Sequence, residues 1–412
     1  MKWPVVTVLS LKSEGQYSLV GGPFGSNLTT RDYKESGVPV IRGANMSETA
    51  CFSEDDFVFV SESKADELRP NNAFKGDLVF TQRGTLGQVG LIPHSSNFDR
   101  YVISQSQMKL TVDPERVNAK FVYYYFRSPS TVQNVKNRAI TSGVPHINLG
   151  ILREFLIPLP PLSIQKDIVA ILDNYDDLIE NNRRRIQLLE ESARLLYKEW
   201  FVHLRFPGHE HVKLTVRVPQ GWRKGRVEDF YSTGSGGTPS RTNPAFFEGT
   251  INWVKTQELV QSFIFSTDEK ITEDALSQSS AKLFPEGSVL VAMYGATIGQ
   301  ASILAAPASS NQACCAVMPR EKGTHSAHAY LFFRESQHLL VNLGQGSAQK
   351  NISQQVIRAF DMMLPPPLLL SEFIDYVDPT FRQIKTLLLA NAKLTQARDL
   401  LLPRLMSGEL AA

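Results

Sequence analysis

An internal duplication is the feature that most constrains how this chain can fold. Residues 76–88 read Gly-Asp-Leu-Val-Phe-Thr-Gln-Arg-Gly-Thr-Leu-Gly-Gln, and residues 287–300 repeat the pattern with one residue inserted between the last two glycines. Both segments combine a turn, an apolar strand and a glycine turn. Two further pairs keep the same order: residues 143–149 match 346–352, which aligns Asn148 with Asn351, and residues 159–161 match 364–366. The repeat predicts two copies of one globular fold.

A long heptad stripe follows each copy, after a proline cluster that cannot continue a regular element. Alternating spacings of three and four residues are typical of a narrow coiled-coil seam, not of a broad core face. The first seam consists of Leu172, Tyr175, Ile179, Asn182, Ile186, Leu189, Ala193, Leu196 and Trp200. The second consists of Val377, Thr380, Ile384, Leu387, Asn391, Leu394, Arg398, Leu401 and Leu405. We expect the two helices to pair with each other.

An antiparallel pairing is favoured because it faces Asn182 with Asn391 and also brings Trp200 near Phe373. A buried Asn in such a seam lowers stability but fixes the register, so both asparagines are predicted to be register residues. About thirty helical residues at 1.5 Å each give a rod on the order of 50 Å, with one globule expected at each end.

The ends of the second helix carry two signals. Asp378-Pro379 predicts a break or restart near its beginning, because proline is tolerated only in a first turn. Gly408 predicts its end.

Composition and charge limit the classes of function. With 412 residues, 42% of them hydrophobic, the chain exceeds what one core normally holds. Its 43 Lys and Arg residues nearly balance 41 Asp and Glu residues, so a polyanion must be bound by local patches. The three cysteines form no paired framework, and neither an export signal nor a membrane span is indicated. We therefore expect a cytoplasmic protein that does not enter a membrane.

The expected fold is α+β: two tandem α/β domains are joined by two long antiparallel helices, as a pseudo-twofold internal repeat. The first domain is predicted over residues 1–162 and the first long helix over 163–203. The second domain is predicted over 204–370, including a turn-rich linker over 204–222. The second long helix and a C-terminal tail take residues 371–412.

Some segments are more specific than periodicity alone. Residues 178–190 read Leu-Ile-Glu-Asn-Asn-Arg-Arg-Arg-Ile-Gln-Leu-Leu-Glu, 197–201 read Tyr-Lys-Glu-Trp-Phe, and 405–410 read Leu-Met-Ser-Gly-Glu-Leu. Gly-Pro-Phe-Gly-Ser at 22–26 and Pro-Gln-Gly-Trp at 219–222 stand near the starts of the globules. In these segments and in its layout, the chain resembles the DNA specificity subunits of type I restriction-modification enzymes over nearly its whole length.

The resemblance implies that each globule is a target-recognition domain that reads one half of a split DNA sequence, with the rod setting their separation. A rod on the order of 50 Å spans about fifteen base pairs. The resemblance also implies that the rod docks two modification subunits, which carry S-adenosylmethionine and methylate adenine, and that up to two restriction subunits join. The chain itself would be non-catalytic and would carry no cofactor.

Motifs for chemistry on this chain are weak. The segment 243–246, Asn-Pro-Ala-Phe, approaches a methyltransferase substrate loop, but its third residue is wrong and an ordinary turn is favoured. The histidines at 203, 209, 211, 325 and 328 have no cysteine beside them, so solvated positions are favoured over metal ligands. No catalytic or metal residue is predicted. Two alternatives stay open: a stand-alone adenine-specific DNA methyltransferase, and a structural scaffold that does not read DNA.

Reading DNA requires cations for phosphates and amide or guanidinium groups for base edges, presented on loops. In the first copy the candidates are Arg31, Lys34, Arg42, Asn45, Arg83, Thr85, Gln88, His146 and Asn148. In the second copy they are Thr238, Ser240, Arg241, Lys255, Gln257, Tyr294, Thr297, Gln300, Gln345, Gln349, Lys350 and Asn351. The recurrence of such residues in both copies favours DNA binding more than any single residue does.

Overall fold

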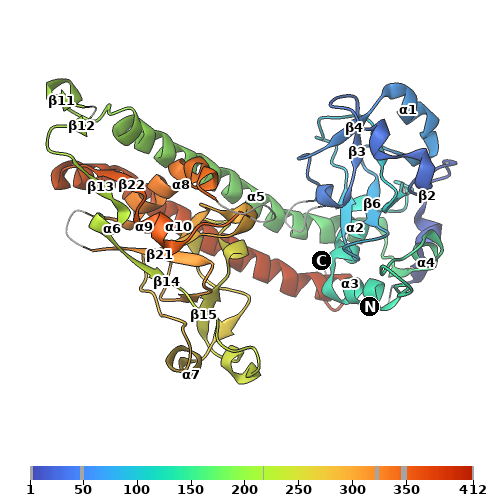
Figure 1. Ribbon diagram of the computed structural model, residues 1–412. Helices are drawn as coiled ribbons and strands as arrows, with labels where there is room; N and C mark the ends of the chain where they lie inside the picture. The colour runs from blue at the N-terminus through green and yellow to red at the C-terminus, as the bar shows by residue number, and fades with distance from the viewer. Residues whose placement is uncertain (1–2, 47–50, 217, 321–323, 345–349, 411–412) are drawn as a thin grey trace. The chain divides into compact units, whose positions relative to one another are not determined.

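The computed structural model describes residues 3–46, 51–216, 218–320, 324–344 and 350–410. The chain divides into two compact units (Figure 1). Unit 1 consists of residues 1–181 and 391–412, and unit 2 consists of residues 182–390. Among the described helices, none combines the length and the apolar character needed to cross a membrane.

Unit 1 contains two four-stranded sheets. The first has the order β2-β9-β6-β7 and is antiparallel throughout. Its strands are β2 (Leu19–Gly21), β6 (Leu78–Thr81), β7 (Val89–Leu91) and β9 (Gln107–Leu110). The second has the order β4-β3-β8-β5, with β3 and β8 parallel. Its strands are β3 (Val38–Ile41), β4 (Val58–Val60), β5 (Asn72–Ala73) and β8 (Tyr101–Ile103).

The other elements of unit 1 surround these sheets. The strands β1 (Val5–Thr7) and β10 (Leu156–Pro158) form an antiparallel pair. The short helices are α1 (Glu62–Glu67), α2 (Ala119–Arg127), α3 (Pro129–Asn137) and α4 (Leu149–Arg153). The main core joins Phe80 and Leu110 of the first sheet to Phe121 of α2. The β-branched and aromatic composition of β6 and β8 suits strands that are buried on both faces.

Unit 2 repeats this topology. Its larger sheet, β14-β21-β18-β19-β16, matches the first sheet of unit 1 with one strand added. The strands are β14 (Tyr231–Ser235), β16 (Phe263–Ile264), β18 (Val289–Ala292), β19 (Ala301–Leu304) and β21 (Cys314–Pro319). The smaller sheet is formed by β15 (Ile251–Val254), β17 (Lys270–Ile271) and β20 (Ser309–Ser310). Here β15 and β20 are parallel, as β3 and β8 are in unit 1.

The remaining elements of unit 2 complete the repeat. The antiparallel pair β13 (Arg223–Arg226) and β22 (Asp361–Leu364) is the counterpart of β1 and β10. The short strands β11 (Leu214–Thr215) and β12 (Val218–Pro219) form a hairpin in the linker. The shorter helices are α6 (Val227–Phe230), α7 (Glu273–Ser277), α8 (Ser326–Asn342) and α9 (Gln354–Arg358). The shared topology confirms the predicted internal repeat.

Two long helices run through the chain, α5 (Leu162–Tyr197) and α10 (Pro367–Met406), drawn in green and red in Figure 1. In unit 1, Asn391 Nδ2 donates to the carbonyl oxygen of Ile179 at 3.4 Å. In unit 2, Ile186 packs on Ile384 and Leu387. Also in unit 2, the rings of Trp200 and Phe373 lie 5.5 Å apart. Residue numbers that rise along α5 meet numbers that fall along α10, which confirms the antiparallel pairing.

The seam predicted from the heptads is buried or half-buried at every position. The first helix ends in a wider π turn over Lys198–Val202, which places Phe201 against Phe373 with ring centres 4.6 Å apart. At the other end, Gly408 has a φ of 72°, a left-handed conformation that stops α10 as predicted.

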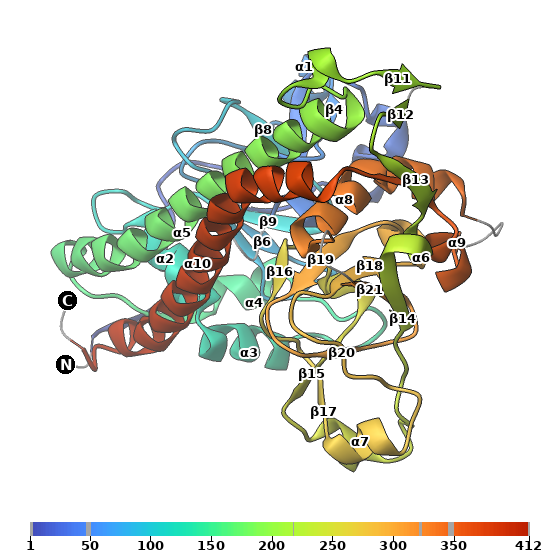
Figure 2. The ribbon, with the colours of Figure 1, turned by 90° about the vertical axis from the view of Figure 1, so that its left-hand side faces the viewer.

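The predicted break at Asp378-Pro379 is wrong, because α10 continues through it. Pro379 is exposed, so the backbone carbonyl left without an N–H partner faces the solvent side of the helix. Val377 and Phe381, on either side, are buried in the core of unit 2 and hold the helix in place. In Figure 2 the helix changes direction along its first half, as proline-containing helices do.

Candidate nucleic-acid interface

In unit 1, strand register gathers several loops at one edge of the sheets. Thr81, the last residue of β6, lies opposite Gln107, the first residue of β9. Gly21 at the end of β2 pairs with Met108, so the loop after β2 starts at the same edge. The parallel strands β3 and β8 also end there, because Ile41 is the partner of Ile103 and Ser104 N–H donates to the Ile41 carbonyl at 3.0 Å. We call this edge the reading edge of unit 1.

The glycine turn between β6 and β7 stands on the reading edge. Gly84 and Gly87 have φ values of 103° and 90°, which glycine adopts without strain. Arg83 forms a backbone bridge with His146. The Arg83 and Thr85 side chains are exposed, and the half-buried His146 ring bonds the Val144 carbonyl at 3.0 Å. The structure thus brings together three of the predicted residues from segments far apart in sequence.

Unit 2 has a matching reading edge. Tyr294 forms a backbone bridge with Asn351, and Gly295 N–H donates to the Lys350 carbonyl at 2.9 Å. Tyr294, Lys350 and Asn351 are exposed. Thr297 is half-buried, with its hydroxyl donating to the Tyr294 carbonyl at 2.8 Å. The predicted residues Gln345 and Gln349 lie outside the described residues.

The backbone bridges Arg83–His146 and Tyr294–Asn351 correct the sequence alignment of the two copies, which matched Asn148 with Asn351. Asn148 caps α4 by accepting from Ile151 N–H at 2.9 Å. The residue that caps α9 is Ser353, and not Asn351. His146, which bridges to the glycine turn, is therefore the counterpart of Asn351, two positions away from the sequence match. A cap satisfies the orphan N–H groups of a helix start, so the Asn148 side chain has a structural use in addition to any contact with DNA.

The loops after β2 and β14 supply further polar groups. Arg31 and Lys34 are exposed in unit 1. In unit 2 the exposed Thr238 donates to Gln312 Oε1 at 2.5 Å, and the exposed Ser240 shares a hydrogen bond of 2.7 Å with Thr242. Arg241 stacks over the Phe247 ring and pairs with Glu269.

Several predicted residues support the loops. Asn45 is fully buried: its Oδ1 accepts from Arg42 N–H at 2.9 Å and its Nδ2 donates to the Asp55 carbonyl at 2.9 Å. Arg42 is half-buried and donates to the carbonyl of Asp56. Lys255 is tied to Glu269 at 3.0 Å, whereas Gln257 beside it is exposed. Burial removes Asn45 from the surface that could meet DNA, so we leave it out of the reading edge.

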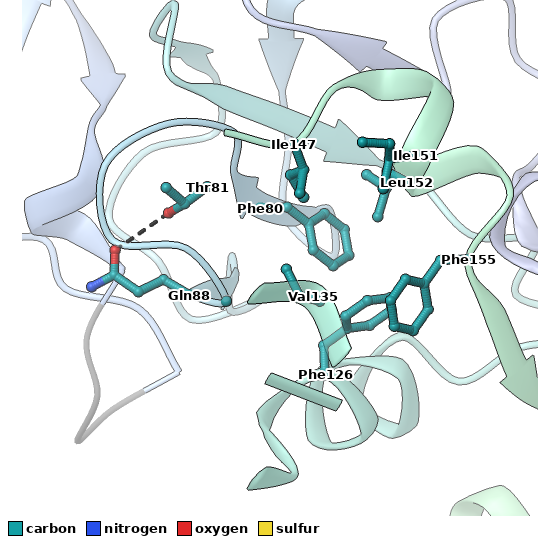
Figure 3. Close-up of a pocket in the computed structure, with 10 residues that line it drawn as sticks. Phe80, Thr81, Gln88, Phe126, Val135, Ile147, Ile151, Leu152 and Phe155 are labelled. Atoms are coloured by element: carbon teal, nitrogen blue, oxygen red, sulfur yellow. Dashed lines mark hydrogen bonds between the residues drawn. The ribbon is translucent and has the colours of Figure 1, made fainter. Parts of the chain in front are cut away.

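Gln88 and Gln300, at matching ends of the glycine turns, are half-buried. Gln88 Nε2 donates to the Met46 carbonyl at 3.3 Å, and its Oε1 accepts from Thr81 at 3.3 Å. Next to Thr81 and Gln88 in unit 1 lies a cavity of only about 10 Å³, lined by Phe80, Phe126 and Phe155 (Figure 3). Such a space holds no more than about one water molecule. The aromatic packing therefore supports the turn and is not a ligand pocket.

Sequence reasoning missed two glutamines. Gln105 precedes β9 by two residues, and Gln312 precedes β21 by two residues. Both are exposed on the reading edges, and Gln105 Nε2 also donates to the Gly25 carbonyl at 2.7 Å. Their equal distance from matching strands was a signal in the duplicated sequence.

The histidines behave differently from one another. His203, His209 and His211 have exposed rings, as expected for the linker. His328 contradicts the expectation of a solvated position, because its side chain is fully buried against Phe201 and Tyr231. Burial lowers the pKa of His328 to about 3. His325 is half-buried and caps α8 by accepting from Ala327 N–H at 3.1 Å.

Among the residues that the structure describes, no group of three or more His, Cys, Asp and Glu could hold a metal ion. The segment 243–246 begins a single 3-10 helical turn, Pro244–Phe247, in which Phe246 N–H donates to the Asn243 carbonyl at 3.2 Å. The candidate functional groups are the exposed polar side chains of the two reading edges.

Comparison with known proteins decides between the possible families. The sequence model described as "Type I restriction modification DNA specificity domain" matches residues 25–191 and again residues 219–378. The chain belongs to this family. Its two matches coincide with the two copies of the duplicated fold. Specificity subunits of type I systems are non-catalytic, and catalysis resides in their partner subunits, which confirms the prediction that this chain is not itself an enzyme.

Individual relatives agree with this assignment. The type I restriction enzyme MjaIX specificity subunit of Methanocaldococcus jannaschii is 25% identical over 342 residues, which cover 82% of this chain and 78% of that protein. The HindI specificity subunit of Haemophilus influenzae is 23% identical over 402 residues, covering 82% and 87%. A crystal structure of the type I S subunit from M. genitalium superposes with a TM-score of 0.56 at 16% identity, covering 98% and 96%, and supports the fold.

Proposed function

We propose that the chain is the sequence-reading subunit of a type I restriction-modification complex, with each reading edge contacting one half of a bipartite DNA target. The observation that carries the proposal is that both units contain the same arrangement of two bridged loops. In each unit a glycine turn is bridged to a second loop, through Arg83 and His146 in unit 1 and through Tyr294 and Asn351 in unit 2. Such loops present donors and cations to base edges and phosphates.

The long helices suit the task of spacing the two half-sites. With 36 and 40 residues, α5 and α10 are about 54 and 60 Å long at 1.5 Å per residue. At 3.4 Å per base pair, such lengths correspond to about 16 to 18 base pairs. In this proposal the pair of helices also docks the modification subunits.

The proposal assigns the chemistry to the partners. Two modification subunits would carry S-adenosylmethionine and methylate adenine, and up to two restriction subunits would join them in the cytoplasm. This chain would hold no cofactor. The reading edges support that division of labour, because they offer hydrogen-bonding groups and cations on exposed loops, as DNA recognition requires.

A domain exchange tests the proposal. Residues 22–150 are replaced by the corresponding segment of another specificity subunit, and the chain is expressed with its modification partners. Sequencing of the methylated bases should show one half of the target changed and the other half retained. A target changed in both halves contradicts independent reading by the two units. Unchanged methylation in both halves contradicts reading by unit 1.

Two alternatives predict other results. A stand-alone methyltransferase predicts micromolar binding of S-adenosylmethionine by the isolated chain, which calorimetry measures. A scaffold that does not read DNA predicts salt-sensitive binding without sequence preference, even when the modification subunits are present.

A further inference from the structure

Arg241 in unit 2 combines features that set it apart from an ordinary surface arginine. Its guanidinium carbon lies 4.1 Å from the centre of the Phe247 ring and 5.3 Å from that of Trp253. Its Nη2 lies 2.7 Å from Glu269 Oε2, yet 56% of the side chain is exposed. Among the described residues, Glu269 is its one polar partner. The remaining N–H groups are available to a ligand.

The support beneath Arg241 is rigid. Trp253 is only 2% exposed, packs in a small core with Phe246 and Ile271, and donates from Nε1 to the Gly237 carbonyl at 3.0 Å. Stacking on the Phe247 and Trp253 rings fixes the plane of the Arg241 guanidinium, so less side-chain entropy is lost when the guanidinium binds a ligand. Preorganisation of this kind serves recognition with a defined orientation.

Glu269 holds the guanidinium edge in place. Its carboxylate also accepts from Lys255 Nζ at 3.0 Å. Burial acts to raise the pKa of Glu269, but the hydrogen bond from Lys255 and the positive charges of Arg241 and Lys255 outweigh it, so the pKa is lowered and the group stays ionised. A fixed carboxylate beside the guanidinium disfavours the approach of a negatively charged phosphate and leaves a neutral base edge as the better ligand.

The loop that carries Arg241 belongs to the reading edge. Thr238 in the same loop is bonded to Gln312, and Met293 N–H donates to the carbonyl of Ala313, the next residue, at 2.9 Å. Met293 precedes Tyr294 and the glycine turn. The hydrogen bonds therefore place the Arg241 loop and the glycine turn on either side of the segment 312–313.

We propose that Arg241 reads a guanine in the half-site of unit 2, donating two N–H groups to O6 and N7 in the major groove, and that Glu269 is its positioning residue. This inference rests on the proposed function. Arginine bound to both guanine acceptors is the commonest base-specific contact, because the spacing of its donors matches theirs. It discriminates against other bases by between about fivefold and about 150-fold.

The test uses the chain in complex with its modification subunits. Methylated-base sequencing first gives the target, and the domain exchange identifies the half read by unit 2. Binding is then measured to duplexes in which each base pair of that half is replaced in turn. Arg241→Lys keeps the charge but loses the planar fork, and Glu269→Gln keeps the shape but loses the charge. Arg205→Lys is the matched control, since Arg205 lies in the linker, is 65% exposed and is paired with Glu199.

We expect wild type to require a guanine at one position, and Arg241→Lys to reduce that discrimination to less than about threefold while other positions keep theirs. Glu269→Gln should reduce discrimination at the same position without weakening binding to unrelated DNA, a pattern that general damage to the fold would not produce. Arg205→Lys should leave every position unchanged.

Two results overturn the inference: a unit 2 half-site without guanine, or an Arg241→Lys complex that is folded yet either keeps all its base preferences or binds every sequence equally weakly. In each case wild-type binding remains sequence-specific. A wild-type complex without sequence preference contradicts the proposed function instead.

Discussion

At the scale of single residues, close backbone approach fixes the loops of the reading edges. Gly22 follows β2, and a Cβ atom there would lie 2.1 Å from the Ser104 carbonyl oxygen and 2.9 Å from Gln105 Cα. Neither neighbour can move freely, because both are backbone atoms at the end of β8. Gly25, three residues later in the same loop, has nothing within 4 Å of such a Cβ.

Gly22→Ala should therefore destabilise unit 1 by about 2 kcal/mol or more, since overpacking against backbone forces the strand ends apart. Gly25→Ala is the control and should change the free energy of unfolding by less than about 0.5 kcal/mol. Urea unfolding followed by circular dichroism measures both. Equal stability of the two variants would show that the loop relaxes.

The buried His328 makes unit 2 sensitive to acid. Its pKa is lowered from 6.5 to about 3 by burial first and by the neighbouring His325 second. Between these values the unfolded chain binds a proton that the folded chain does not, so stability falls as pH drops below about 6.5. The slope from this one group approaches about 1.4 kcal/mol per pH unit.

His328→Phe should flatten the dependence of unfolding free energy on pH between about 6 and 4, whatever its effect on stability at pH 7. The same substitution at His338, an exposed residue of the same helix, should leave the slope as in wild type. Urea titrations at several pH values provide the slopes. An unchanged slope in His328→Phe would mean that His328 stays charged in the folded chain.

At the scale of elements, one ion pair joins the two long helices within unit 1. Arg398 Nη1 lies 2.6 Å from Asp176 Oδ1, and the Arg398 side chain is 10% exposed. Tyr124 of α2 donates to the other oxygen of Asp176 at 2.7 Å. The pair thus ties α5, α10 and α2 together at one of the polar positions of the seam.

Arg398→Leu should lower the free energy of unfolding by about 1–3 kcal/mol, because it leaves a half-buried carboxylate without its cation. Asp176→Asn in the same chain should restore part of the loss. Arg404→Leu on the same helix is the control, with an expected change below about 0.5 kcal/mol, since Arg404 is exposed and pairs only with Glu409 among the described residues. Thermal unfolding compares the variants.

Helices and turns could be predicted from the sequence, whereas contacts between distant residues could not. Heptad periodicity in the sequence located the long helices and their seam, and glycines located the turns, because both patterns are local consequences of residue type. Of the two carboxylates that pair with Arg398, Asp399 is its neighbour in sequence, but Asp176 could not be predicted because it is distant in sequence. Pro379 was misread because flanking burial of Val377 and Phe381 outweighs its local preference. Likewise, Asn45 was predicted to contact DNA because its side chain is polar. The sequence could not show that this side chain is buried and donates to backbone carbonyl groups such as that of Asp55.

At the scale of the whole molecule, the proposed role of α5 and α10 as a spacer predicts the gap between the half-sites. Insertion of one heptad into both helices, with matching seam residues, keeps the a and d positions in register. Seven residues add about 10.5 Å, or about three base pairs at 3.4 Å each. The methylated target should then keep both half-sites and gain about three base pairs between them.

Insertion into α5 alone should abolish specific methylation, because the seam of one helix would slip past that of the other. Replacing a heptad without lengthening the helix controls for the change of residues and should leave the gap unchanged. Sequencing of methylated bases measures the gap between the half-sites for all three variants: the double insertion, the insertion into α5 alone and the heptad replacement. A chain with both insertions that still methylates its target at the original spacing would mean that something other than the helices determines the distance between the half-sites.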